Sequence, residues 1–365
     1  MKLSQLTSYL ESMAPLSYQE DYDNAGLIVG NADKEVRQAL LSLDCTEAVV
    51  EEAINKDCQV IISHHPIVFR GLKKLTGKTY VERVVEKAIK NDIAIYAIHT
   101  NLDNVMDGVN AKICEALELT NCRILAPKSG LLKKLVTYVP QDKADQVRNA
   151  LFHAGAGNIG NYSECSFNAE GQGTFKGGED TNPYVGEPGK RHYEQEVRIE
   201  TVFPSNIESK LLMALFLAHP YEEVAYDLYE LTNQHNQVGS GMIGELEDEI
   251  TEEEFLFVLK QNMQARVIRH TALRGNNVKR VAVCGGAGSF LLKNAIAAGA
   301  DIFVTADYKY HEFFDAEGRV VIADIGHFES EQFTAQLLYD IIRKKFPNFA
   351  VRLTEINTNP IKYFI

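Results

Sequence analysis

Residues 60–66 read Val-Ile-Ile-Ser-His-His-Pro, and this short stretch decides how the rest of the chain is interpreted. Its first three residues predict a buried strand, which Pro66 ends because proline has no backbone N–H to donate. In an α/β sheet, ligands bind beyond the carboxyl ends of the strands. The adjacent imidazoles of His64 and His65 are therefore expected at a binding site.

Two further apolar stretches, residues 93–98 and 320–323, predict strands that run toward side chains of the same kind. The side chains beyond these strands that carry an imidazole or a carboxylate are His99, Asp103, His327 and Glu331. Imidazoles and carboxylates are the ligand types of metal-dependent enzymes. Three predicted strand ends thus point to one metal site.

Each of these residues also has a structural interpretation. Neighbouring side chains on a strand point to opposite faces, so a His-His pair can simply be one buried and one exposed histidine. Asp103 could cap a turn through Asn104. Glu331 could be a favourable charge in the first turn of a last helix over 331–346, capped by Ser330. The matching positions at three strand ends favour the metal site.

The residues predicted to hold metal are His64, His65, Asp103, His327 and Glu331. Mixed nitrogen and oxygen ligands suit Zn²⁺, Mn²⁺, Fe²⁺ or Mg²⁺ rather than a closed structural zinc site. Five ligands exceed what one catalytic ion needs, so we expect two divalent ions per chain, about 3.5–4 Å apart, with a bridging hydroxide as nucleophile. The candidate catalytic residues are Glu331 and His99, the latter as a further ligand or proton carrier.

Composition limits the kinds of partner. The net charge of −13 argues against broad binding to nucleic acid or anionic membranes. No apolar run is long enough to cross a bilayer, and the N-terminus does not resemble a secretory signal. The six scattered cysteines predict free thiols. We therefore expect a cytoplasmic protein that acts on a small molecule, with no membrane partner.

The length of 365 residues predicts two domains. Residues 1–128 and 236–365 alternate helix and strand patterns, which predicts a discontinuous α/β core with a mostly parallel sheet. Residues 129–235 follow the order β-α-β-β-α-β, which is typical of a ferredoxin-like α+β domain. The predicted fold is thus a metal-binding α/β core with an inserted ferredoxin-like domain.

Two loops near the predicted site have open interpretations. Residues 285–289, Gly-Gly-Ala-Gly-Ser, lie between a predicted strand and helix, where they could hold a phosphate or form a tight turn. Their spacing matches neither a dinucleotide fingerprint nor a P-loop. In the loop after residue 306, Asp307 could orient a metal ligand, while Lys309 and His311 could contact an anionic substrate.

The motifs together resemble the dinuclear-metal-centre family, whose members are often labelled GTP cyclohydrolase 1 type 2 homologues. The residues that carry this resemblance are 23–27 (Asp-Asn-Ala-Gly-Leu), 63–66, 99–103, His327 and Glu331. The resemblance runs from the first predicted helix to the last. It implies that His65 and Asp103 hold one ion, that His64 and His327 hold the other, and that Glu331 bridges them.

The resemblance also implies an assembly. Family members are expected to form a toroidal homohexamer, a trimer of dimers, with the metal sites facing an inner cavity. Residues 219–224, His-Pro-Tyr-Glu-Glu-Val, are similar to trimeric signalling and metal-tolerance proteins of the nitrogen-regulator superfamily. An inserted domain of that kind would reinforce trimer contacts or cover the mouth of the cavity.

The first functional hypothesis is a dimetal-dependent hydrolase, in the specific form of GTP ring opening at C8 by a metal-bound hydroxide. Nothing in the sequence specifies guanine, since the chain has no clear Asn-Lys-x-Asp base-recognition motif. A dimetal phosphatase or phosphodiesterase is the second enzyme hypothesis. The non-enzymatic alternative is a metal-binding regulatory or interaction assembly, with the inserted domain as its sensor.

Overall fold

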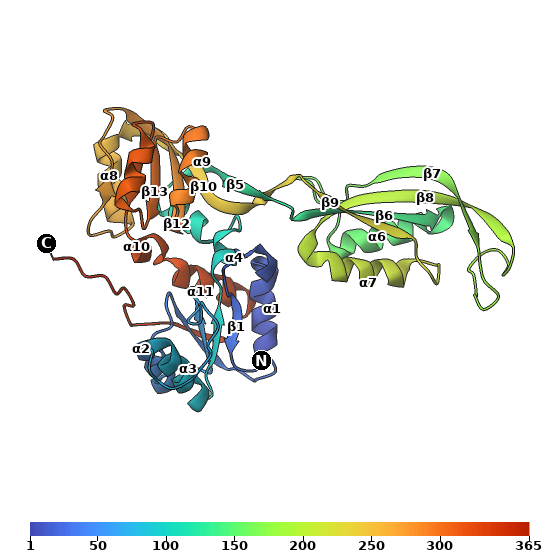
Figure 1. The fold of residues 1–365 in the computed structure, drawn as a ribbon, viewed down its shortest axis with the longest axis horizontal. Helices are drawn as coiled ribbons and strands as arrows, with labels where there is room; N and C mark the ends of the chain where they lie inside the picture. Colours follow the sequence, from blue (N-terminus) through green and yellow to red (C-terminus); the bar gives the residue numbers. More distant parts are fainter. Residues whose placement is uncertain (365) are drawn as a thin grey trace. The chain divides into compact units, whose positions relative to one another are not determined.

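A computed structural model describes residues 1–364 (Figure 1). The chain forms a mixed α/β fold with three sheets and separates into two compact units. The smaller unit is Lys128–Asn236, and the larger unit combines Met1–Pro127 with the segment from Gln237 onward. No helix within residues 1–364 has the length and apolar character needed to cross a membrane. All six cysteines are free.

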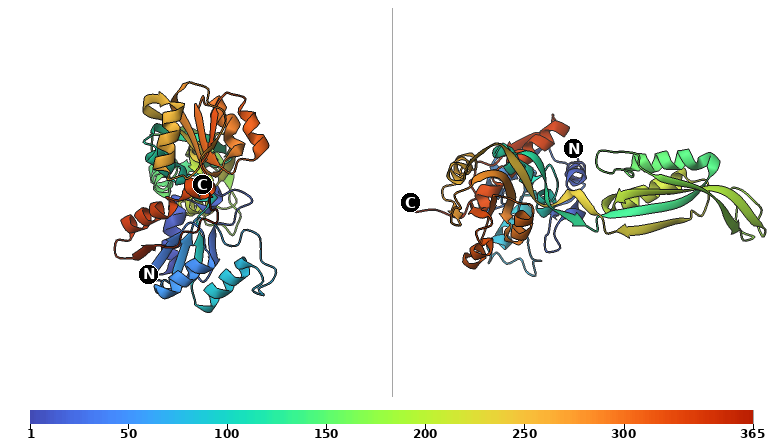
Figure 2. Two further views of the ribbon diagram at one scale, coloured as in Figure 1. Left: turned by 90° about the vertical axis from the view of Figure 1, so that its left-hand side faces the viewer. Right: turned by 90° about the horizontal axis from the view of Figure 1, so that it is seen from above.

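The first sheet of the larger unit has five strands, four of them parallel. In spatial order they are β1 (Gly26–Val29), β4 (Ala94–Ala97), β3 (Val60–Ser63), β2 (Gln38–Ser42) and β15 (Ala350–Leu353), with β1 antiparallel to β4. Every side chain of β3 and β4 is buried, as expected for strands covered on both faces. Figure 2 shows this sheet, mainly in blue, from a second direction.

Amphipathic helices cover this sheet and explain the burial of its strands. The covering helices are α1 (Leu3–Met13), α2 (Glu47–Asn55), α3 (Tyr80–Lys90) and α11 (Thr334–Lys345). Leu6 of α1 and Leu338 of α11 pack in one core with Ile62 of β3. Val50 of α2 and Val84 of α3 pack in a separate core with the neighbouring strand residue Ile61. Alternate residues of one strand therefore serve the two faces.

The second sheet of the larger unit is mixed. In spatial order its strands are β11 (Arg269–His270), β14 (Val321–Asp324), β13 (Ile302–Ala306), β12 (Asn277–Ala287), β10 (Gln234–Thr251) and β5 (Thr120–Ser129). Strands β12, β13 and β14 are parallel, whereas β10 and β11 run antiparallel to their neighbours β12 and β14. The helices and 3-10 turns of this region are α5 (Val109–Ala116), α8 (Glu252–Asn262), η4 (Ser289–Leu291), α9 (Leu292–Ala297) and η5 (Tyr310–Ala316).

The smaller unit is a four-stranded antiparallel sheet with two helices. Its strands are β6 (Leu132–Pro140), β7 (Phe167–Lys176), β8 (Arg191–Pro204) and β9 (Tyr226–Leu231), in the spatial order β7-β8-β6-β9. Helices α6 (Ala144–Ala154) and α7 (Glu208–Ala218) pack on the same face of this sheet around Val147, Leu211 and Ile199 (Figure 1). The 3-10 turns η2 (Gln141–Lys143) and η3 (Ser205–Ile207) precede the helices.

Two sequence-based predictions of local structure need correction. The expected single helix over 331–346 is divided into α10 (His327–Glu331) and α11, so Glu331 ends one helix instead of beginning another. Ser330 does not cap α11, because its hydroxyl donates to the His327 carbonyl at 2.8 Å. The polar residues after β4 form a short helix, α4 (Thr100–Asp103), and the chain has one more short turn, η1 (Leu16–Tyr18).

Candidate metal centre

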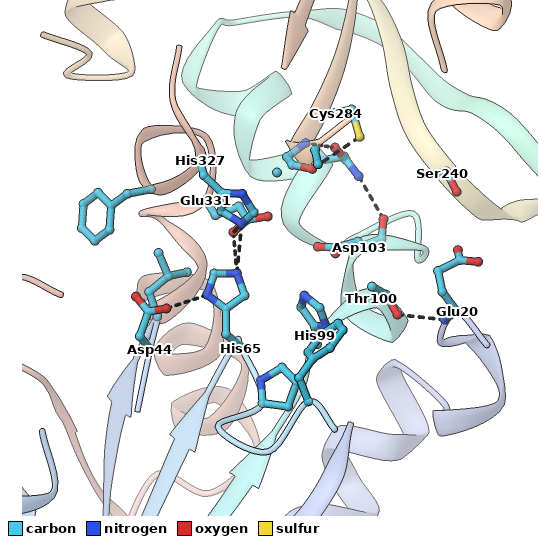
Figure 3. Close-up of a pocket in the computed structure, with 18 of the residues that line it drawn as sticks. Glu20, Asp44, His65, His99, Thr100, Asp103, Ser240, Cys284, His327 and Glu331 are labelled. Atoms are coloured by element: carbon cyan, nitrogen blue, oxygen red, sulfur yellow. Dashed lines mark hydrogen bonds and ion pairs between the residues drawn. The ribbon is translucent and has the colours of Figure 1, made fainter. Parts of the chain in front are cut away.

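The ends of strands from both sheets of the larger unit border one cavity, with a volume of about 470 Å³. Figure 3 shows imidazoles and carboxylates that face one another in this cavity. The predicted site residues gathered at or directly behind its wall are His64, His65, His99, Asp103, His327 and Glu331. They follow β3, β4 and β14, so segments more than 200 residues apart in the sequence contribute to one site.

The first candidate ligand group contains His64, Asp103 and Glu331. His64 is fully buried, and its Nδ1–H donates to the carbonyl of Ile98 at 2.8 Å, which leaves the Nε2 lone pair directed at the cavity. Nε2 lies 3.6 Å from Asp103 Oδ1 and 3.8 Å from Glu331 Oε1. These distances are too long for hydrogen bonds but suit atoms arranged around an ion.

Three buried atoms of this group have no hydrogen-bond partner among residues 1–364. They are His64 Nε2, Asp103 Oδ1 and Glu331 Oε2. Burying a polar atom without a partner costs free energy, so such atoms are rare in folded proteins and call for an explanation. A divalent cation beside His64 and Asp103 would satisfy two of these atoms, and a cation beside His65 and His327 would satisfy Glu331 Oε2. The side chains present therefore fit metal ions.

The second candidate group contains His65, His327 and Glu331. Glu331 Oε2 lies 3.0 Å from His65 Nε2 and 3.2 Å from His327 Nε2, and the two Nε2 atoms are 3.2 Å apart. The other nitrogen of each ring is held by a carboxylate. His65 Nδ1 contacts Asp44 Oδ1 at 2.8 Å, and His327 Nδ1 contacts Asp307 Oδ2 at 2.7 Å. Carboxylates behind histidine ligands fix the ring orientation and make the imidazole a stronger ligand.

The shortest distances join other side chains than the pairs that the family resemblance assigns to each ion, and that assignment stays a prediction. The resemblance paired His65 with Asp103 and His64 with His327. In the structure His65 lies beside His327, and His64 lies beside Asp103. Residues 64 and 65 lie in a bend just beyond the end of β3, so both rings reach the same site, with their centres 5.0 Å apart. Glu331 belongs to both groups, as expected for a bridging carboxylate.

The local charges shift the pKa values of the site residues in opposite directions. Burial opposes protonation of His65, but the hydrogen bond with Asp44 and the close Glu331 carboxylate raise its pKa to about 9. Burial likewise opposes protonation of His327, whereas Asp307 and Glu331 raise its pKa to about 11. Despite burial, these histidines hold the pKa of Glu331 well below its usual value. Without metal, the protonated rings of His65 and His327 supply the positive charge that the Glu331 carboxylate needs.

Burial is the main cause of the pKa shifts of His64 and Asp103. Burial lowers the pKa of His64, so this imidazole is neutral and its Nε2 is available as a ligand. Burial and the neighbouring charge of Glu331 raise the pKa of Asp103 well above its usual value. Two carboxyl groups that share a buried site cannot both stay ionised without a positive partner.

His99 is held in a different way from the other histidines. Its Nδ1 contacts Asp23 Oδ1 at 2.7 Å, while Asp23 Oδ2 accepts the backbone N–H of Thr100 at 3.0 Å. Burial would raise the pKa of Asp23, but the hydrogen bond with His99 and the His99 charge lower it to about 2. The His99 ring centre is 5.2 Å from that of His64 and 5.3 Å from that of His65. His99 therefore presents an oriented ring at the edge of the candidate metal groups.

The glycine-rich segment at the end of β12 has a role beyond the two interpretations of its sequence. Two of its backbone N–H groups are already used, since Gly285 donates to Asn110 Oδ1 and Gly286 donates to Ser330 Oγ, both at 2.9 Å. Gly286 has a φ of 64°, and a Cβ there would lie 2.5 Å from Glu331 Oε1. The loop is thus no free phosphate cradle among the described residues. It leaves the space that the Glu331 carboxylate occupies.

Sequence reasoning assigned no role to Asp44 and Asp23. Asp44 follows β2, the strand next to β3 in the same sheet, so the strand-end rule that found the histidines could also have found it. Asp307 does hold a predicted ligand, His327. Lys309 and His311 lie outside the cavity lining. The lining contains no lysine or arginine, and its aromatic members are Tyr22, Phe69, Phe290 and Phe328.

The fold and the site together define a mixed α/β protein with a candidate metal centre of histidines and carboxylates. Comparison with known proteins then identifies its family. The family Duf34/NIF3 (NGG1p interacting factor 3) matches residues 1–360, and the chain belongs to it. A Bacillus subtilis relative named GTP cyclohydrolase 1 type 2 homolog is 39% identical over 365 residues, covering 98% of each chain.

Solved structures support the same assignment. A Bacillus cereus protein related to NIF3 has a TM-score of 0.86 and 39% identity, covering 100% of this chain and 99% of that chain. A Staphylococcus aureus protein has a TM-score of 0.79 and 32% identity over the same shares of the two chains. The fold of the whole chain is therefore that of experimentally determined structures.

Proposed function

We propose that the larger unit holds two divalent ions. One would be bound by His64 and Asp103, the other by His65 and His327, with Glu331 shared between them. The observation that carries this proposal is the set of buried, unpartnered ligand atoms on His64, Asp103 and Glu331. The carboxylates of Asp44 and Asp307 behind the second pair of ligands add to it.

The chemistry proposed for the site is hydrolysis. Divalent ions supply Lewis acidity, which makes water a nucleophile near neutral pH. His99, oriented by Asp23, would carry protons between the reacting groups and solvent. The cavity of about 470 Å³ has the size of a small-molecule site, and its aromatic side chains offer faces for a planar ring.

The substrate class that we propose is a nucleotide, with opening of the GTP imidazole ring as the specific reaction. The name of the Bacillus subtilis relative, GTP cyclohydrolase 1 type 2 homolog, supports this choice. Because the lining has no lysine or arginine, phosphate groups would meet positive charge mainly at the ions and the histidines. Hydrolysis of a phosphate ester, by a phosphatase or a phosphodiesterase, is therefore the competing reaction.

The metal proposal is tested by the metal content of the purified protein and its variants. We expect about two ions per chain by mass spectrometry in the unaltered protein. His64→Ala and His65→Ala should each remove about one ion, because the two residues belong to different ligand groups. His311→Ala, an exposed histidine outside the cavity, is the control. Equal metal content in all four proteins would refute the proposal.

The substrate proposal is tested with metal-loaded protein and GTP. Release of formate would support ring opening, and release of inorganic phosphate would replace this proposal with a phosphatase. Metal-loaded protein that releases neither product would favour a non-catalytic metal-binding protein. His99 also forms a possible ligand group with His64 and His65, so the His99→Ala variant separates its two candidate roles. Lost turnover with retained metal would support a proton carrier, and lost metal would support a further ligand.

We also propose that the smaller unit is a ferredoxin-like inserted domain and that the full chain forms a homohexamer. The spatial order β7-β8-β6-β9, with both helices on one face, supports the first part. The second part rests on the family resemblance. Native mass spectrometry of the full chain tests it, with six chains per particle as the expected result.

A further inference from the structure

The smaller unit contains a cavity of its own, with a volume of about 640 Å³. Residues of β7 and β8, the loop after β7 and the segment around residues 221–225 line it, and all belong to residues 128–236. Its aromatic members are Tyr138, Phe175, Tyr184 and Tyr221. This volume is typical of a site for a small organic molecule.

A buried carboxylate faces this cavity. Glu196 is only 9% exposed, and the hydroxyl of Tyr221 donates to its Oε1 at 2.9 Å. Within residues 1–364, no lysine, arginine or histidine forms an ion pair with Glu196 at 4.0 Å or less. A buried charge normally needs a partner of opposite sign, and one phenol supplies only part of that.

The strand opposite Glu196 provides the space for this carboxylate. Glu196 pairs with Gly171 across β7 and β8, and a second glycine, Gly173, follows on the same face. A Cβ at Gly173 would lie 2.0 Å from Glu196 Oε2, whereas a Cβ at Gly171 would meet no atom within 4 Å. Gly173 thus leaves the space that the carboxylate occupies, whereas Gly171 borders open space.

Hydrogen bonds fix the ring of Tyr221 beside Glu196. The backbone N–H of Tyr221 donates to His219 Nδ1 at 3.1 Å, and His219 Nε2–H donates to the Tyr138 carbonyl at 3.0 Å. Burial lowers the pKa of His219, which keeps it in the neutral form that this arrangement needs. The Tyr221 ring centre is 5.9 Å from Phe175 and 6.3 Å from Tyr184.

The charged side chains of the lining favour a positive ligand. Four are carboxylates and two are cationic, and the six are Glu170, Lys176, Glu196, Arg198, Glu222 and Glu223. Arg198 pairs with Glu200 at 2.9 Å, so its charge is already matched outside the cavity. Aromatic faces attract cations as well, with Tyr among the effective rings.

We propose that this cavity binds an organic cation. Its ammonium group pairs with Glu196 and the phenol oxygen of Tyr221, and its apolar body lies against the rings of Phe175 and Tyr184. An inorganic ion would leave the aromatic walls without a role, whereas an organic amine uses both the carboxylate and the rings. This site is independent of the candidate metal centre.

The test is a ligand-observed NMR titration of the full chain at neutral pH with phenethylamine, an aromatic primary amine. The neutral analogue 2-phenylethanol has the same shape and should bind at least about tenfold more weakly, because a hydrogen bond to a charged group is lost. Glu196→Gln should weaken amine binding by about tenfold for the same reason. Glu208→Gln is the matched control, since Glu208 pairs with Lys133 at 2.8 Å and neither residue lines the cavity.

Three results would overturn the proposal. The amine and the alcohol could bind equally, Glu196→Gln could leave amine binding unchanged, or Glu208→Gln could weaken it as much as Glu196→Gln does. Sedimentation velocity of the same samples provides a fourth possible result against the proposal. If the amine does not bind and Glu196→Gln changes the oligomeric state, the cavity is covered by a second copy of the chain and takes no small ligand. Normal melting temperatures of both variants confirm that they fold.

Discussion

Each of the two units buries a glutamate against a glycine, but the surroundings of the two carboxylates differ. In the larger unit a Cβ at Gly286 would lie 2.5 Å from Glu331 Oε1. In the smaller unit a Cβ at Gly173 would lie 2.0 Å from Glu196 Oε2. Three histidines lie near Glu331, whereas Tyr221 and other aromatic rings accompany Glu196.

This difference teaches which cation each carboxylate can take. Imidazole nitrogens have directed lone pairs, so histidines fixed by Asp44, Asp307 and a backbone carbonyl favour a divalent metal ion. Aromatic faces spread their negative potential over a ring and favour an organic cation. In both units we propose the buried carboxylate as a cation ligand, and its neighbours would select the kind of cation.

The largest expected effect concerns Glu331, because it belongs to both candidate ligand groups. Glu331→Gln keeps the size of the side chain but removes the charge shared between them. We expect metal content to fall from about two ions per chain to well below one, as measured by mass spectrometry. Glu329→Gln is the control, since Glu329 is buried on the same helix but accepts from Asn359 instead. Retained metal in Glu331→Gln would contradict the shared role.

The second prediction concerns the glycine that seats Glu331. Gly286→Ala should displace the carboxylate and weaken metal binding by about 10–100-fold, the range seen when groups that support metal ligands are altered. Gly318→Ala is a matched control, because Gly318 has a similar φ of 69° but a Cβ there would meet no atom within 4 Å. Both variants carry the same backbone strain. Equal metal affinities of the two variants, measured by calorimetry, would show that Gly286 is needed only for the backbone turn and not for the position of Glu331.

The third prediction concerns protons. Without metal, the pKa values of about 9 for His65 and about 11 for His327 keep both rings protonated at pH 7. Since metal binds only the neutral ring, metal binding at pH 7 should release about two protons, and affinity should fall as the pH decreases. Titration calorimetry in buffers of different ionisation enthalpy counts these protons.

The Asp44→Asn variant tests whether His65 is one of the groups that release a proton when metal binds. Asp44→Asn removes a hydrogen bond that raises the pKa of His65, so fewer protons should be released at pH 7. It should also weaken metal binding by about 10–100-fold, because the ring loses the carboxylate that orients it. Proton release that is the same with and without Asp44 would mean that His65 does not bind the ion.

Part of this site could be predicted from the sequence, because one physical rule covers it. Apolar stretches that end in polar residues predict strand ends, and His64, His65, His99 and Asp103 follow β3 and β4 as the rule requires. The rule assumes one sheet, however, and the centre also uses β12 and β14 of a second sheet. Which sheet a strand joins depends on contacts between distant residues, and no local pattern encodes them.

The remaining features had no local signal. Gly286 looked like a turn or phosphate loop because its contact with Glu331 spans 45 positions of the chain. Strand β7 lies in a glycine-rich, largely exposed stretch, so it lacks the alternation of apolar residues that predicts a strand. Gly171 and Gly173 interrupt the apolar alternation in β7, and Gly173 is also the residue that makes room for Glu196.

The smallest expected effect tests whether the glycine in the smaller unit works as Gly286 does. Gly173→Ala should push the Glu196 carboxylate aside and weaken phenethylamine binding by about 3–10-fold, as the loss of one hydrogen bond would. Gly171→Ala, on the same strand, meets no atom within 4 Å and should leave binding nearly unchanged. Because the displaced atom is the end of a flexible side chain, both variants should melt at similar temperatures. Equal binding by the two variants would mean that Gly173 does not position the carboxylate, and the parallel between the two glutamates would be lost.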